Sequence, residues 1–210
     1  MPAKIDWPEA VRPLLKKYKG KAHPLEYKSV YQLVVMVVLS AQDSDKHINQ
    51  IAPKFFEIFP DMKALSKASP DIISKQISDV RNFGNKAKWL SEMAEKIKDN
   101  KNIPQNLEEL TALPGIGRKS ANVILRESGL PAEGIIVDLH VVRVAPRLGI
   151  ASGADPKKIE KMMMDVLPQK DWDAGMAMSF LGREICRPTN PKCEICVMNK
   201  VCAYYNENKK

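Results

Sequence analysis

The sequence predicts an all-α protein. Apolar residues recur at helical spacing along most of the 210 residues, and several segments open with a helix-capping residue. Strand-like alternation is almost missing, and its best candidate, 134–137, is very short. With 44% hydrophobic residues, a chain of this length can bury one large core or two smaller cores.

The first predicted helix covers 8–18, where apolar residues share one face. The second covers 30–41. Ser29 and Gln32 form a capping box before it, and the run is apolar on nearly every side, which predicts a central buried helix. An amphipathic helix over 45–58 follows.

Ser69-Pro70-Asp71 predicts another helix start, because serine caps well and proline suits the first helical position. The remaining predicted helices show the same apolar periodicity; they cover 86–98, 106–113, 118–128, 138–148, 156–166 and 171–184.

A short internal repeat relates 80–87 to 113–120. Both segments have the same order of residue types: an apolar residue, two turn-prone residues, an apolar residue, Gly, a polar residue, Lys and a small residue. This predicts two helix–turn–helix hairpins of one design, with coincidence as the alternative.

The net charge of +8 favours a polyanionic partner, most simply nucleic acid. A soluble protein that is merely rich in lysine is the alternative. The N-terminus has no apolar signal core, and the longest apolar run, 33–39, is too short to span a bilayer. We therefore expect no membrane partner and a reducing compartment.

Four cysteines, the only ones in the chain, lie close together near the C-terminus; they are Cys186, Cys193, Cys196 and Cys202. A reducing compartment argues against two disulfides, and four thiolates can close around one metal centre. Zinc is usually held by two Cys-x2-Cys pairs, and only one such pair is present, so the spacing leans away from zinc.

The segment Leu-Pro-Gly-Ile-Gly at 113–117 lies between two predicted helices. Gly115 and Gly117 permit a turn whose backbone N–H groups face outward, and the next helix adds its positive end. A DNA phosphate can bind there without any base being read. A plain turn between helices is an equally good interpretation of this segment alone.

Lys119 follows Arg118 in the first turn of that helix. A cation is electrostatically disfavoured there, which favours the neutral amine, a nucleophile. A simple phosphate contact is the alternative role. Asp138 is the expected N-cap of 138–148, but its carboxylate could also stabilise a cationic sugar or accept a proton. We expect His140 to be structural.

Together these segments resemble endonuclease III, a family of helix–hairpin–helix DNA glycosylases with AP-lyase activity. The resemblance runs from about residue 27 to residue 204. It is carried by LSAQDSD (39–45), LPGIGRKSANVIL (113–125), VDLHVVRV (137–144) and the spacing Cys-x6-Cys-x2-Cys-x5-Cys.

The resemblance implies two all-α lobes with DNA bound across the groove between them. A six-helix barrel domain with the helix–hairpin–helix would take 24–134, and an iron–sulfur cluster domain would take 1–23 and 135–210. The four cysteines would ligate a [4Fe–4S] cluster.

The resemblance also implies roles for single residues. Lys119 would attack C1′ of the damaged nucleotide and form a Schiff base, Asp138 would assist it, and Gln42 would fill the gap left by the flipped base. The residues expected at the DNA backbone are Gly115, Gly117, Arg118, Arg187 and Lys192.

The implied activity is a bifunctional DNA glycosylase and AP lyase that removes oxidised pyrimidines from double-stranded DNA and cuts abasic sites by β-elimination. We expect a monomer in a prokaryotic cytoplasm, associated with the nucleoid. A non-enzymatic DNA-binding module and a glycosylase with a weak lyase step are the alternatives. Relatives that excise adenine typically carry a small hydroxyl residue in place of Lys119.

Two positions depart from the family pattern. Leu139 stands where a threonine is common, and 82–84 differs from the usual sequence of the second DNA-inserting loop. Leu139 removes a hydroxyl near the site, which bears on how Asp138 is held. Base recognition and opposite-strand contacts are the parts of the resemblance that these departures affect.

Overall fold

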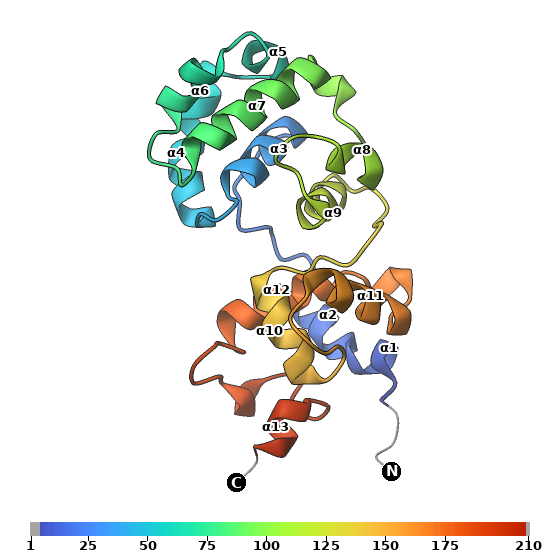
Figure 1. Ribbon diagram of the computed structural model, residues 1–210. Helices are drawn as coiled ribbons and strands as arrows, with labels where there is room; N and C mark the ends of the chain where they lie inside the picture. The colour runs from blue at the N-terminus through green and yellow to red at the C-terminus, as the bar shows by residue number, and fades with distance from the viewer. Residues whose placement is uncertain (1–4, 209–210) are drawn as a thin grey trace. The chain divides into compact units, whose positions relative to one another are not determined.

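The computed structural model describes residues 5–208, and it contains helices but no strand within that range. The all-α prediction is therefore confirmed (Figure 1). The chain divides into two compact units: one is formed by 22–133, and the other by the N-terminal segment up to Lys21 with 134 onward. No helix in the described range is long and apolar enough to cross a membrane.

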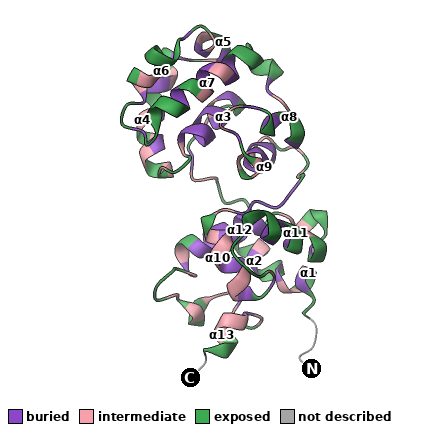
Figure 2. Cartoon of the chain, viewed as in Figure 1, coloured by how far each residue is buried: buried purple, intermediate pink, exposed green. Residues whose placement is uncertain are grey.

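The unit formed by 22–133 is built around one central helix. Its helices are α3 (Val30–Leu39), α4 (Asp45–Ile58), α5 (Met62–Leu65), α6 (Pro70–Gln76), α7 (Phe83–Ile97), α8 (Leu107–Thr111) and α9 (Arg118–Glu127). Nearly every residue of α3 is buried, and α4, α7 and α9 pack against it (Figure 2). The predicted central helix is confirmed.

Local capping chemistry sets the start of α3 as the sequence predicted. The Ser29 hydroxyl accepts the Gln32 backbone N–H at 3.2 Å. The return bond of the capping box is shifted by one residue, because the Gln32 side chain accepts the N–H of Lys28 at 2.8 Å. Ser69 caps α6 in the same way.

The second unit is built on the packed pair α10 and α12. Its helices are α1 (Trp7–Ala10), α2 (Arg12–Tyr18), α10 (Leu139–Leu148), α11 (Pro156–Val166), α12 (Ala174–Glu184) and α13 (Ala203–Glu207). Helix α12 packs against α10 and α2. Gly175 allows α12 to lie directly on the extended segment before α10, since a β-carbon there would overlap the Ile136 carbonyl oxygen.

Three sequence predictions need correction. The helix expected over 8–18 is two helices, because Pro13 cannot donate the backbone hydrogen bond that would continue the first. Helix α7 begins at Phe83 rather than at 86, directly after Asn82, whose left-handed φ of 59° ends the preceding turn. The strand candidate 134–137 is buried extended chain without a partner strand in the described range.

Candidate functional site

The predicted hairpin joins α8 to α9, and its backbone requires glycine at one position. Gly115 has a left-handed φ of 79°, and a β-carbon there would lie 3.0 Å from Cε3 of Trp89 and 3.2 Å from Cγ1 of Val38. Ile116 is buried and anchors the turn. The turn is therefore pressed against the C-terminal part of α3 and the middle of α7.

Gly117 is the N-cap of α9 and leaves the helix start uncovered. Its φ is −94°, so any residue could adopt this backbone, and an added β-carbon would meet nothing within 4 Å. No side chain caps α9. The first N–H groups of the helix are therefore suited to an anion.

Lys119 is exposed as the second residue of α9. Its neighbour Arg118 is half-buried, and its guanidinium donates to the carbonyl of Glu133 at 3.4 Å. The chain thus presents one primary amine to solvent beside an open helix N-terminus, while the adjacent guanidinium is held against the protein.

The loop carrying Gln42 leaves the C-terminal end of α3. Gln42 is exposed at its tip with a left-handed φ of 59°, and Ser44 then caps α4 through the N–H of His47 at 3.1 Å. Since Val38 near the end of α3 faces Gly115, the hairpin and this loop lie at the same end of α3. Two of the predicted DNA-binding segments are therefore brought together in this unit.

Asp138 lies in the other unit, and both of its carboxylate oxygens are engaged. Oδ1 accepts the N–H groups of His140 and Val141, each at 2.9 Å, which makes Asp138 the N-cap of α10. Oδ2 accepts the hydroxyl of Ser179, on α12, at 2.6 Å. The carboxylate is thereby fixed in one orientation.

Ser179 is a site residue that the sequence did not reveal. It is completely buried, and its only sequence signal is a hydroxyl within the apolar run Ala177–Leu181. Next to Asp138, Leu139 is 71% exposed. An apolar side chain therefore stands in solvent beside the carboxylate.

The four cysteines have reduced thiols and line one pocket in this unit. Leu148, Leu181 and Tyr204 complete its apolar wall. Burial is the main cause that raises the pKa of the thiols of Cys193, Cys196 and Cys202, and the neighbouring cysteines add to it. Protonated thiols are thus favoured unless positive charge enters the pocket.

The spacing of the thiols bears on what the pocket can hold. Within 5–208, no three His, Cys, Asp or Glu side chains are gathered closely enough to hold a single metal ion. A lone zinc ion would need its four sulfur ligands at about 2.3 Å from one point. All four thiols nevertheless line one pocket, and together they are a donor set suited to a metal centre.

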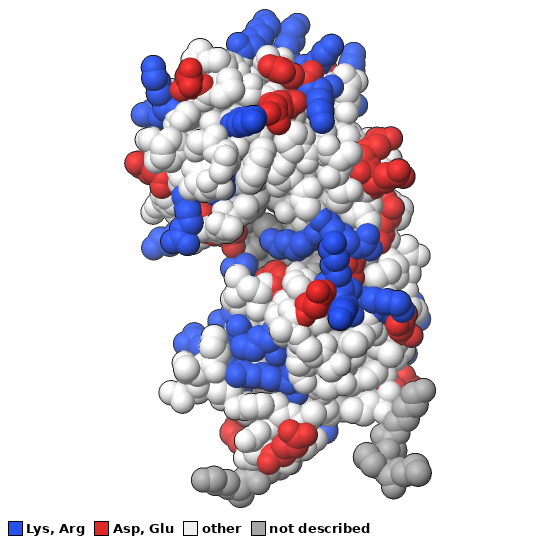
Figure 3. All heavy atoms as spheres, in the orientation of Figure 1, with Lys and Arg blue, Asp and Glu red and all other residues white. Residues whose placement is uncertain are grey.

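Arg147, on α10, donates hydrogen bonds to the backbone of the segment between the first two cysteines. Its guanidinium donates to the carbonyls of Arg187 at 2.8 Å and Pro188 at 3.0 Å, and it lies 3.5 Å from Sγ of Cys186. The side chains of Arg187 and Lys192 are exposed. Figure 3 shows that Lys and Arg side chains gather in patches on the face drawn.

Comparison with known proteins places these features. Residues 35–169 match the model of the HhH-GPD superfamily of base excision DNA repair proteins. Endonuclease III of Synechocystis sp. is 36% identical over 192 residues, which cover 90% of this chain and 88% of that protein. The chain belongs to the endonuclease III family. It is therefore an enzyme, a DNA glycosylase of base excision repair.

Other relatives agree with this assignment. Endonuclease III of Thermotoga maritima is 31% identical and covers 96% of this chain. A solved structure of endonuclease III trapped as a covalent intermediate with DNA matches with a TM-score of 0.84 and 28% identity, covering 95% of both chains. A thermostable thymine-DNA glycosylase, at 22% identity and a TM-score of 0.79, shares the fold.

Proposed function

We propose that this member of the endonuclease III family is a bifunctional DNA glycosylase and AP lyase that acts on oxidised pyrimidines. The observation that carries the proposal is the exposed amine of Lys119 in the first turn of α9, directly after the glycine hairpin. An exposed amine can reach a deoxyribose carbon, whereas a buried one cannot.

In the proposed reaction, the nitrogen lone pair of Lys119 bonds to C1′ while the glycosidic bond breaks, and the base leaves with that bond's electron pair and takes up a proton. The bonded nitrogen then loses one proton, and its lone pair expels O4′ as the sugar ring opens. O4′ takes up a proton, which leaves a protonated Schiff base. Loss of a proton from C2′ expels the 3′ phosphate, which cuts the strand by β-elimination.

Asp138 supplies negative charge for the cationic sugar and assists deprotonation of the amine. Its orientation supports this role, because the cap bonds hold Oδ1 and Ser179 holds Oδ2. A fixed charge stabilises a developing cation without reorganising during the reaction.

The proposed substrate is double-stranded DNA with damaged bases or abasic sites. The net charge of +8 supports this substrate. The similar solved structure described above is a trapped covalent intermediate of endonuclease III with DNA. We propose that Gln42 fills the gap left by the flipped nucleotide. The residues proposed at the phosphates are Gly115, Gly117, Arg118, Arg187 and Lys192.

We propose that Cys186, Cys193, Cys196 and Cys202 hold a [4Fe–4S] cluster, as is known for this family. The common pocket supports a metal centre, and the single Cys-x2-Cys pair in the sequence favours a cluster over zinc. When bound, the cluster would link the C-terminal segment by four covalent bonds. It would thereby order 187–192 for contact with DNA.

We further propose that the unit formed by 22–133 is the six-helix barrel domain and that the other unit is the iron–sulfur cluster domain. The proposed state is a monomer in a prokaryotic cytoplasm, acting at the nucleoid. Sedimentation of the purified protein tests the monomer.

Borohydride trapping on abasic-site DNA tests the reaction. We expect the wild-type protein to form a covalent adduct and the Lys119→Ala variant to form none. Lys75→Ala, which removes an exposed lysine from α6, is the matched control and should trap normally. Base release without strand cutting or trapping would instead show a glycosylase with a weak lyase step.

Iron and sulfide analysis tests the cluster. We expect a brown protein with broad absorption at the blue end of the visible range, lost in Cys196→Ser. A colourless protein containing one zinc would contradict the proposal.

A further inference from the structure

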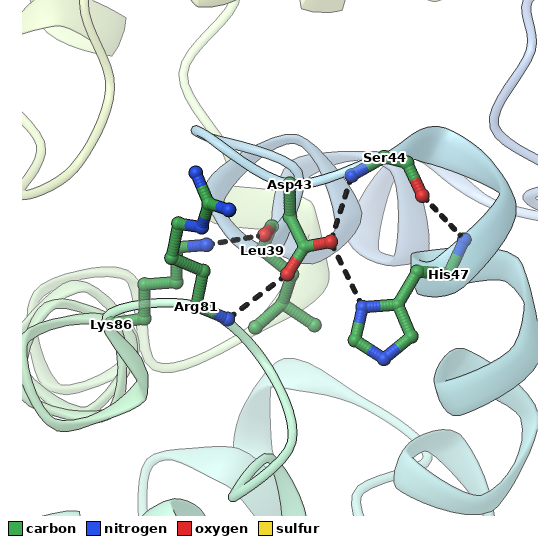
Figure 4. Close-up of polar contacts among 6 residues, drawn as sticks. All are labelled: Leu39, Asp43, Ser44, His47, Arg81 and Lys86. Atoms are coloured by element: carbon green, nitrogen blue, oxygen red, sulfur yellow. Dashed lines mark hydrogen bonds and ion pairs between the residues drawn. The ribbon is translucent and has the colours of Figure 1, made fainter.

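A single carboxylate joins two exposed loops of the unit formed by 22–133. Asp43 follows Gln42 in the loop after α3, and its Oδ2 accepts the backbone N–H of Arg81 at 2.9 Å. Its Oδ1 accepts the N–H of Ser44 at 2.7 Å and lies 2.8 Å from Nδ1 of His47 (Figure 4). Asp43 therefore spans from its own loop to the turn before α7.

The carboxylate is built to stay charged in this position. Burial alone would raise its pKa, but the hydrogen bonds from Arg81, His47 and Ser44 outweigh burial and hold the pKa of Asp43 below its ordinary value. Charge-assisted bonds to backbone N–H groups are stronger than neutral ones. The link between the loops is thus present at neutral pH.

Both loops carry a strained residue at the tip. Gln42 and Asn82 each have a left-handed φ of 59°, and both are exposed. A non-glycine residue in this conformation costs about 1 kcal/mol and persists only when its surroundings impose it. Asp43 lies one residue after the first tip and bonds the residue before the second.

A second hydrogen bond joins the start of α7 to the end of α3, next to the loops that Asp43 links. Lys86 is buried, and its Nζ donates to the carbonyl of Leu39 at 2.6 Å, at the end of α3 where the first loop begins. In the internal repeat, Lys86 corresponds to Lys119 and Asn82 corresponds to Gly115. Both segments have a left-handed residue at this position, but α7 begins at the next residue, Phe83, whereas α9 begins only at Arg118. The lysine of 80–87 is used inside the fold.

We propose that Asp43 is a positioning residue that holds the tips of Gln42 and Asn82 together, so that they enter the DNA as one preformed wedge. This rests on the proposed function, in which Gln42 fills the gap of the flipped nucleotide. Both tips end in carboxamides, which can donate and accept hydrogen bonds at the edge of the base left unpaired. Holding them in place beforehand removes the cost of ordering them on binding.

Electrostatics and positioning predict opposite effects for the loss of this carboxylate. A negative charge near a phosphate weakens binding, so removing it should strengthen general DNA affinity. If Asp43 positions the wedge, removing its carboxylate should instead slow the reaction on any duplex that has a base opposite the flipped nucleotide. The two effects can be separated by the choice of substrate.

The test compares two abasic-site duplexes under single-turnover conditions with excess enzyme. In the first duplex, a normal nucleotide faces the abasic site. The second duplex lacks that facing nucleotide, so no base is left unpaired opposite the site. For Asp43→Ala we expect the cleavage rate on the first to fall about tenfold, with the rate on the second unchanged. Asp43→Asn, which keeps one acceptor oxygen, should fall between wild type and Asp43→Ala.

The matched control is Asp79→Asn. Asp79 is exposed near the same turn, so its loss changes the charge while the bonds of Asp43 remain. We expect this variant to cleave both duplexes at the wild-type rate. Amide hydrogen exchange supplies a second measurement, since the N–H groups of Ser44 and Arg81 should exchange faster in Asp43→Ala.

Equal loss on both duplexes would overturn the wedge and make Asp43 a general structural residue. Unchanged rates on both, or unchanged exchange at Arg81, would also overturn it. If Asp43→Ala does not fold, the substrate ratio and exchange of Asp43→Asn decide the question. Wild-type protein that cleaves neither duplex would overturn the proposed function itself, which is a distinct result.

Discussion

At the scale of single residues, Asp138 is the N-cap of α10, and the same bonds bear on the catalytic role that we propose for it. One oxygen caps α10 through two backbone N–H groups, and the other accepts the hydroxyl of Ser179. The cap bonds therefore also fix the carboxylate that we propose for the reaction. Capping and catalysis can be separated by substitutions that disturb only one of them.

Asp138→Asn should retain DNA affinity and lose turnover. The amide oxygen can still accept the cap bonds, but the negative charge that we propose for the sugar cation is gone. Single-turnover cleavage and the Kd for abasic-site DNA check this. Equal loss of both would show that Asp138 acts as a cap alone.

Ser179→Ala should lower turnover roughly tenfold with little change in DNA affinity, because it removes one hydrogen bond to a charged group. The same two measurements apply. Ser91→Ala is the control, since Ser91 is a buried serine that bonds the carbonyl of Ala68 in the other unit. A wild-type rate in Ser179→Ala would show that the cap bonds alone position Asp138.

At the scale of elements, the two glycines of the hairpin serve different purposes. Gly115 is required by the fold, because its φ is positive and Trp89 and Val38 occupy the space of a side chain. Gly117 has an ordinary φ and open space around it. Its lack of a side chain therefore matters for what approaches α9 from outside.

Gly115→Ala should destabilise the protein by about 1–3 kcal/mol, because it adds backbone strain and a steric overlap. Gly117→Ala should leave stability unchanged and weaken DNA binding, since a methyl group would then face the phosphate. Chemical unfolding and DNA titration of both variants check this. Equal destabilisation by the two substitutions would contradict the distinction.

Glu184 links two elements of the other unit in a pH-dependent way. It accepts hydrogen bonds from the Lys21 ammonium and from the Tyr18 hydroxyl, so α12 is tied to α2. The bond from Lys21 is the main cause that lowers the pKa of Glu184 below its ordinary value of 4.5, although burial opposes it. The resulting stabilisation is fully present above the unfolded pKa and is lost as pH falls through the folded pKa.

Glu184→Gln should therefore lower the free energy of unfolding at neutral pH by at most about 1 kcal/mol, because the pair is partly exposed and screened by solvent. The difference from wild type should shrink below the ordinary glutamate pKa. Urea unfolding of both proteins across this range measures it, with Glu207→Gln as an exposed control. A difference independent of pH would show that the lowered pKa does not contribute to stability.

At the scale of the whole molecule, the charge of +8 is the property that concerns DNA most directly. The two exposed cations of 187–192 and the open start of α9 belong to different units of the chain. If both units bind the phosphate backbone, affinity should depend on salt through several independent contacts.

Affinity for DNA should fall steeply and linearly on a double logarithmic plot against salt concentration. Lys192→Ala and Arg187→Ala should each reduce the slope by about 1 and weaken binding similarly for different sequences. Titration at several salt concentrations checks this. A slope unchanged by both substitutions would remove 187–192 from the DNA interface.

Four features could be predicted from the amino-acid sequence alone: the helical class, the serine-capped helix starts, the glycine hairpin and the grouping of the cysteines. These features depend on neighbours within a few residues, since caps, turn geometry and helical periodicity are local. Only the tertiary structure revealed that Ser179 holds Asp138, that Asp43 joins two loops, and that Lys86 is buried while its counterpart Lys119 is exposed. These contacts join residues about 40 positions apart, so they depend on how helices pack, which no local pattern records.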